Sequence, residues 1–149
     1  MKTLFQRETL DEVISRIDRL GTASVRQWGK MDVAQMMAHC SLVMDMALGR
    51  LNFPRVFIGR LLGPFFKPMC TNEKPLPRNS ITDERLVISD QRDFAHEREE
   101  LKQRVLQFHG GGEAQCTRHP HPFVGKLTPH AWARVMYKHL DHHLQQFSV

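Results

Sequence analysis

The sequence predicts an all-α protein: a four-helix bundle forming a single domain over residues 1–149. Three observations predict this fold. Four stretches repeat apolar residues at the spacing of an amphipathic helix, and no stretch shows a convincing strand alternation. A long segment between the second and third stretches is interrupted by glycine and proline. Such a crossover lets the second pair of helices pack in an order other than simple up-down-up-down.

The composition is that of an ordinary globular protein. Hydrophobic residues make up 41% of the chain and charged residues 25%. No apolar run approaches the roughly 20 residues that a membrane span needs. The net charge of +5 comes from Lys and Arg that are mixed with Asp and Glu along the chain. This pattern favours a solvated basic surface over nucleic-acid binding, so we expect no nucleic acid as a partner. Without a spanning segment we also expect no membrane as a partner.

The cysteines and the N-terminus indicate a cytoplasmic protein. Cys40, Cys70 and Cys116 are odd in number, far apart and outside any CxxC motif, so they predict no disulfide framework. The N-terminus turns acidic before an apolar core could form, which is not typical of a signal peptide. A reducing cytoplasm is therefore the expected location.

The first helix is expected from about Leu10 to Leu20, where every third or fourth residue is apolar. Thr9 and Glu12 have the spacing of a capping box, and Gly21 is a natural C-terminal stop. Nothing in this helix carries chemistry, so we interpret it as structural.

The second helix is expected from about Met31 to Leu48, ending at Gly49. Its apolar face is broad enough to pack against two neighbours. His39 lies mid-helix beside this face and is the only histidine before His96. Gln35 lies one turn earlier on the same ridge, where it could line a site around His39 or simply pack.

The helical pattern then breaks over residues 52–77. Two glycines and three prolines interrupt the apolar segment 53–69, which argues against one long helix. We expect one or two short helices from Pro54 to about Leu62, followed by an extended crossover. Three roles are open for the apolar segment: a cover over a pocket, a dimer surface, or a plug at one end of the core.

The third helix is expected from about Gln91 to His109, before the glycines 110–112. Ser89 or Asp90 is the expected cap, and Asp93 suits the first turn electrostatically. His96 lies in a charged run on this helix and is interpreted as solvent-exposed.

A long loop over residues 110–128 follows. Cys116 and His119 have Cys-x-x-His spacing, but no second half of a zinc site lies nearby. His121 lies between two prolines, which predict a rigid turn. We interpret these three residues as loop residues without a shared site.

The last helix is expected over Leu127–Phe147, with Thr128 as its cap and Pro129 in its first turn. His139 and His143 lie within its apolar stripe, four residues apart and therefore on one face. Two imidazoles in this arrangement can bind one metal ion if a neighbouring helix supplies a third ligand. His39 is the candidate for that ligand.

Three imidazoles leave a zinc-like ion with an open position for water or substrate. Such an ion can lower the pKa of bound water, activate a thiolate or polarise a carbonyl. His142 is an alternative partner for His139 at three-residue spacing, and Asp141 is interpreted as solvated. A metal-free bundle, in which the histidines only pack and hydrogen-bond, also fits the spacing.

Two stretches of the sequence resemble the DinB/YfiT-like superfamily of bacterial four-helix proteins, and within it a small uncharacterised group. They are WGKMDVAQMMAHC, which begins at Trp28 and contains His39, and HPFVGKLTPHAWARVMYKHLDHHLQQF, which ends at Phe147. The resemblance implies an up-down-down-up bundle with a long crossover between helices 2 and 3. It also implies a divalent metal, zinc or nickel, bound by His39, His139 and His143, and it implies homodimers.

The predicted function is therefore that of a metal-dependent enzyme, a hydrolase or a thiol S-transferase, acting on a small molecule. Trp132 could wall its pocket or pack structurally, and no residue can be named as general base. The alternative function is a non-catalytic helical bundle that binds a metal or ligand. An open coordination position above a reachable pocket would distinguish the first function from the second.

Overall fold

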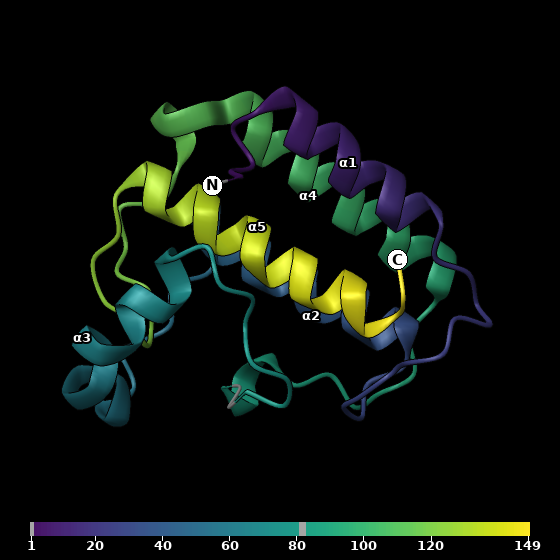
Figure 1. Cartoon of the computed structure of the whole chain (residues 1–149), viewed down its shortest axis with the longest axis horizontal. Coiled ribbons are helices and arrows are strands. Elements are labelled where there is room, and N and C mark those ends of the chain that lie inside the picture. Colours follow the sequence, from purple (N-terminus) through teal and green to yellow (C-terminus); the bar gives the residue numbers. More distant parts are fainter. Residues whose placement is uncertain (1, 81–82) are drawn as a thin grey trace.

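The computed structural model describes residues 2–80 and 83–149, and these residues form an all-α protein without a named strand. An isolated bridge pairs His121 with Gly125. Over the described residues there are five α-helices and one short 3-10 helix, η1 (Figure 1). Their bounds are α1 Arg7–Asp18, α2 Val33–Ala47, α3 Phe57–Thr71, η1 Glu84–Leu86, α4 Phe94–Gln115 and α5 Pro129–Gln146.

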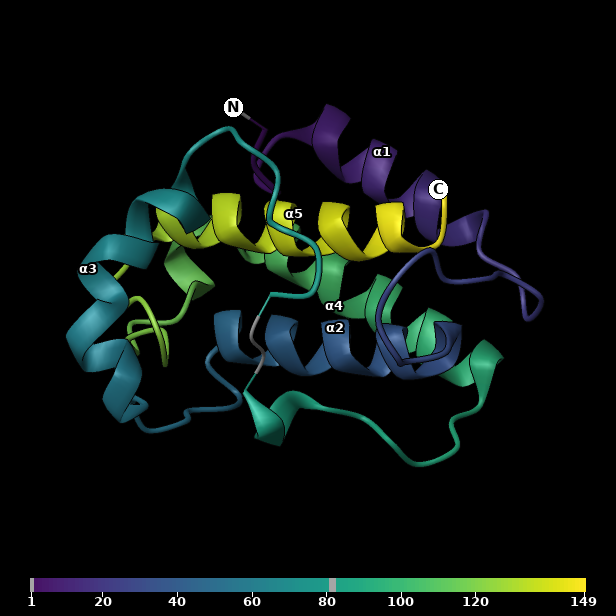
Figure 2. The same cartoon turned by 60° about the horizontal axis from the view of Figure 1, so that its bottom comes forward.

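Helices α1, α2, α4 and α5 pack against one another, and α3 stands at one end of this group (Figures 1 and 2). α1 and α5 run in one direction, and α2 and α4 run in the other (Figure 2). Backbone hydrogen bonds join the corresponding ends: Leu4 N–H donates to Ala133 O, and Thr117 N–H donates to Ala47 O. No helix of the described residues is long and apolar enough to cross a bilayer.

The core lies between these four helices and is made by the apolar stripes that the periodicity predicts. Its largest fully buried side chains are Trp132, Phe108, Leu4, Ile17, Met36, Met37, Met44, Leu101, Met136, Leu140, Leu144 and Val13. Methionine is frequent here because its flexible thioether fills irregular gaps between helices.

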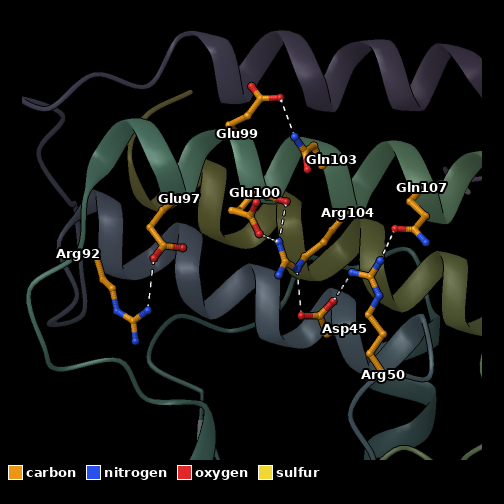
Figure 3. A network of polar contacts seen from close by, with 9 residues as sticks. All are labelled: Asp45, Arg50, Arg92, Glu97, Glu99, Glu100, Gln103, Arg104 and Gln107. Carbon is orange, nitrogen blue, oxygen red and sulfur yellow. Dashed lines mark hydrogen bonds and ion pairs between the residues drawn. The ribbon is translucent and has the colours of Figure 1, made fainter.

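A polar network joins α2 to α4 along one flank of the core (Figure 3). Asp45 is 8% exposed, and its carboxylate accepts from Arg104 Nε and from Arg50 Nη1, each at 2.9 Å. Arg104 also donates to Glu100 Oε2 at 2.6 Å. Asp45 therefore joins two guanidinium groups, and Arg104 keeps Glu100 as a partner if Asp45 is removed.

α1 begins three residues earlier than predicted. Its N-cap is Gln6, and the Thr9 hydroxyl contacts the Gln6 side chain at 3.4 Å. The predicted capping box of Thr9 and Glu12 is therefore wrong. The earlier start follows from tertiary packing, because the fully buried Leu4 anchors the chain just before the helix.

α2 agrees with its prediction to within two residues at each end. Asp32 and Gln35 form a complete capping box at its start: Gln35 N–H donates to Asp32 Oδ1 at 2.8 Å, and Asp32 N–H donates to Gln35 Oε1 at 2.9 Å. Gly49 follows the helix with a φ of +75°, a conformation that favours glycine.

The prediction of one or two short helices from Pro54 to about Leu62 is wrong, because one helix, α3, continues through Pro64 and Pro68 to Thr71. The extended crossover predicted after them is confirmed over residues 72–80. Each proline removes one helical hydrogen bond, and the ribbon of α3 bends along its length (Figure 2). Both prolines lie on the exposed side, where water can reach the unpaired carbonyls. Lys138 Nζ donates to Asn72 O and Oδ1, which ties down the C-terminal end.

α4 begins at Phe94 with Asp93 as its N-cap, whose carboxylate accepts from His96 N–H at 2.7 Å. The predicted caps Ser89 and Asp90 are therefore wrong. The predicted end at His109 is also wrong, because the helix continues to Gln115 with a break at Gly112, where φ is 54° and ψ is −152°.

α5 confirms the predicted last helix. The Thr128 hydroxyl accepts from Ala131 N–H at 3.2 Å, and Pro129 occupies the first turn. The missing N–H of Pro129 costs nothing at this position. The local signals at this helix start therefore predict its position correctly.

Candidate metal centre

Three histidines from two helices meet between α2 and α5. His39 comes from the middle of α2, and His139 and His143 come from successive turns of α5. One ligand nitrogen from each ring lies within 4.8 Å of those of the other two. The Nε2 atoms of His39 and His139 are 3.0 Å apart, and the three ring centroids are separated by 4.6–5.0 Å.

The spacing of these nitrogens fits a shared divalent ion. An ion with metal–nitrogen distances of about 2.0–2.1 Å in tetrahedral geometry places its ligand nitrogens about 3.3 Å apart. The 3.0 Å contact between His39 and His139 is already close to this value. The remaining separations, all below 4.8 Å, reach it through small side-chain rotations.

The His39 ring is oriented by a backbone carbonyl from the crossover. Its Nδ1 lies 2.8 Å from Leu86 O, and a carbonyl oxygen only accepts, so Nδ1 carries the proton. The lone pair of Nε2 therefore points into the cluster. Leu86 ends η1, a 3-10 turn whose N-cap Asp83 accepts from Arg85 N–H. A hydrogen bond of this kind commonly orients a metal-binding histidine.

The His143 ring is oriented by Gln146, one turn further along α5. Gln146 Nε2 donates to Trp28 O at 2.6 Å, which fixes the amide with Oε1 turned toward His143. His143 Nδ1 lies 2.9 Å from that oxygen and donates to it. The lone pair of His143 Nε2 is thereby left for the cluster, as in His39.

Gly29 makes room for this Gln146 amide. A Cβ atom at position 29 would lie 2.5 Å from Gln146 Nε2, and Gly29 has a φ of +78°. Both the close approach and the left-handed backbone favour glycine. The loop before α2 therefore contacts the Gln146 amide, which in turn orients the His143 ring.

Burial keeps the cluster uncharged. Burial lowers the pKa of His39, and it lowers the pKa of His139 well below its ordinary value, with His143 as the next cause. The pKa of His143 falls to about 3, first through burial and then through the nearby His39. Neutral imidazoles keep the lone pairs that a metal ion needs.

The spatial arrangement selects His143 over the alternative His142. The His142 ring packs against Trp28 at 5.4 Å between centroids, and it is His143 that joins the cluster with His39 and His139. Asp141, predicted to be solvated, instead accepts from Arg16 Nη1 at 2.7 Å. It therefore contributes to the contact between α5 and α1.

Two other residues considered for the site have structural roles. Gln35 caps α2 and donates to Asp90 O at 3.1 Å. Trp132 is 1% exposed in the core, where its ring contacts His121 at 5.3 Å between centroids. Gln35 therefore caps α2, and Trp132 packs in the core.

The loop residues Cys116, His119 and His121 do not form a shared site with one another. Cys116 is buried, whereas His119 is exposed. His121 Nδ1 accepts from Phe123 N–H at 3.2 Å, and burial lowers its pKa to about 4. His121 therefore shapes the turn before α5.

Sequence reasoning did not identify the two residues that orient the histidine rings. Gln146 lies three residues after His143 on the same helix, so the spacing could have indicated it. Leu86 contributes a main-chain oxygen from a distant 3-10 turn, which no side-chain pattern indicates.

These features define a helical protein with a buried cluster of three histidines that could hold a metal ion. The chain belongs to the family described as DUF1569, protein of unknown function, whose model matches residues 2–149. No curated protein and no solved structure matches the chain. The family assigns no function, so the function must be argued from the site.

Proposed function

We propose that this protein is a divalent-metal-dependent enzyme, a hydrolase or a thiol S-transferase, that acts on a small molecule. His39, His139 and His143 are its proposed metal ligands, and zinc or nickel is the proposed ion. The observation that carries the proposal is the agreement of two independent hydrogen bonds. Leu86 O and Gln146 Oε1 each occupy a histidine Nδ1, and each thereby leaves an Nε2 lone pair free to bind a metal ion.

A relation to the DinB-like bundles is part of this proposal. It is supported by the all-α fold, by the opposite directions of the two helix pairs, and by the position of the three histidines on α2 and α5. The proposed location is the cytoplasm, in keeping with three free cysteines.

The chain's own residues would bind and orient the reactants. Three protein ligands leave a divalent ion with an open position, at which it acts as a Lewis acid. His139 is half-buried as a whole residue, whereas His39 and His143 are buried, so the side of α5 that carries His139 is the proposed approach for a substrate. The apolar side chains of α2 and α5 exclude water from the opposite side.

The burial of the cluster favours a second candidate function, a metal-binding module without turnover. His39 is 2% exposed and His143 is 9% exposed. Two cavities, of about 390 and 170 Å³, are lined by other residues, near Glu12 and near Asp45 respectively. In this second function a fourth ligand would close the site, and the ion would stabilise the bundle.

Activity measurements on metal-free and metal-loaded protein separate the two functions. The metal-loaded chain would be assayed for hydrolysis of small esters and amides and for conjugation of low-molecular-weight thiols to electrophiles. A His39→Ala, His139→Ala, His143→Ala variant serves as control. Turnover that requires both the metal and the histidines supports the enzyme. Stoichiometric metal that raises the melting temperature without turnover on either panel favours the binding module.

A further inference from the structure

One face of α3 exposes large apolar side chains to solvent. Phe57, Leu61 and Phe65 are 84%, 67% and 78% exposed, and they follow one another at four-residue spacing on one side of the helix. Ile58 and Phe66 extend this surface, with exposed fractions of 52% and 39%. We call these five residues the α3 apolar face. A contiguous exposed patch of this kind marks an interaction surface.

The opposite side of α3 is fixed to the rest of the molecule. Gly59 and Gly63 are buried, and a Cβ at either position would lie 2.5–2.9 Å from backbone atoms of the 122–123 turn. Arg55 Nη2 donates to Gly59 O at 2.9 Å, and Lys138 Nζ binds the C-terminal end of the helix. The α3 apolar face is therefore held outward.

Helix α3 and the loop beside it carry basic side chains and no carboxylate of their own. Loop 116–128 lies beside α3 (Figures 1 and 2). Neither α3 nor this loop contains Asp or Glu, and their basic residues are Arg60, Lys67, Arg118 and Lys126. Asp45 and Glu113, near the ends of α2 and α4, are ion-paired with Arg50 and His130.

We propose that α3 docks this protein onto the surface of an anionic lipid bilayer. Phe57, Leu61 and Phe65 would enter the boundary between headgroups and acyl chains, with the helix parallel to the surface. Arg60 and Lys67, also on α3 and exposed, would meet anionic headgroups. Large apolar side chains on a helix whose only charged residues are basic match the chemistry of this surface.

The charge distribution selects the bilayer over a second copy of the chain. Two copies that met through α3 would bring Arg60 and Lys67 of each copy together, and like charges oppose such a contact. The proposal also differs from the expectation of no membrane partner, which followed from the absence of a spanning segment. A helix that lies on a bilayer needs no such segment.

Co-sedimentation of the full chain with vesicles tests the proposal. The vesicles would contain phosphatidylcholine with about 30% phosphatidylglycerol, or phosphatidylcholine alone. The chain should bind the anionic vesicles, and a Phe57→Ser, Leu61→Ser, Phe65→Ser variant should bind them about 100-fold more weakly. Leu106→Ser, at a 48% exposed residue of α4, is the matched control and should bind as the unaltered chain does.

A pair of charge variants tests the electrostatic part. Arg60→Glu should weaken binding to anionic vesicles by about 30-fold, because two charge units change at about 1 kcal/mol each. Arg19→Glu changes the same charge at the other end of the molecule and should leave binding unchanged. Equal binding of the serine variant and the unaltered chain would overturn the proposal. A dimer of the unaltered chain that the serine variant dissolves would overturn it in favour of a second copy.

Discussion

Replacing Gln146 with methionine should weaken both the fold and the metal site. Gln146 is 3% exposed, and its amide joins His143 Nδ1 to Trp28 O at 2.9 and 2.6 Å. Methionine keeps the length of the side chain but leaves a buried N–H and a buried carbonyl unpaired. At about 1–2 kcal/mol for each unsatisfied group, the free energy of unfolding should fall by about 2–4 kcal/mol.

The same substitution should lower metal affinity about 10- to 100-fold, because the His143 ring loses the bond that sets its tautomer. Urea unfolding of the metal-free chain measures the first effect, and zinc titration against a competing chelator measures the second. Gln145→Met, at the exposed neighbouring position, is the matched control. It removes one exposed hydrogen bond to Asp141, so it should lower the free energy of unfolding by no more than about 1 kcal/mol and leave zinc affinity unchanged. Unaltered zinc affinity in Gln146→Met would refute the argument that this amide orients the ligand.

Four further substitutions test the fold by urea unfolding. Burial holds the pKa of His121 at about 4, against 6.5 when exposed, so the unfolded chain binds its proton first as the pH falls. Stability should therefore be about 2 kcal/mol lower at pH 5 than at pH 8 through this residue, and His121→Asn should remove that part of the slope. Gly59→Ala should destabilise by about 1–3 kcal/mol, because its Cβ would lie 2.7 Å from Phe123 Cα. Gly110→Ala, with nothing within 4 Å, should instead stabilise by up to about 1 kcal/mol. Asp45→Ala should cost about 1–2 kcal/mol, since it removes two charged hydrogen bonds while Arg104 keeps Glu100 and Arg50 is half-exposed.

The helices that the sequence predicts well are those with local signals at their ends. Thr128 and Pro129 start α5, and both act within one turn of the backbone groups that they satisfy. The apolar period places His139 and His143 together on one side of that helix. Signals of this kind depend only on neighbouring residues, so the sequence shows them even when the fold is unknown.

The sequence misleads where tertiary contacts outweigh local preference. Pro64 and Pro68 predict a break in the chain, yet α3 continues through both. Its buried Gly59 and Gly63 allow a close approach to the 122–123 turn, and Lys138 binds its end from α5. These contacts involve residues that are far apart in the sequence, so no local sequence pattern indicates them.

The same distinction between local and long-range contacts applies to the candidate site. The histidines of α5 follow from helical spacing, and His39 follows from its place mid-helix beside an apolar face. The partner of His39 Nδ1 is a main-chain oxygen, Leu86 O, that arrives with η1 from 47 residues away. Any residue can present a carbonyl, so sequence alone does not indicate which one orients the ring.

The proposed function requires that His39, His139 and His143 together hold one divalent ion. Elemental analysis would measure the metal content of the purified chain without an affinity tag, beside the variant in which all three histidines are alanine. We expect close to one equivalent of metal in the unaltered chain and none in the variant. An unaltered chain without metal, even after incubation with zinc, nickel, manganese and iron, would contradict the proposed function.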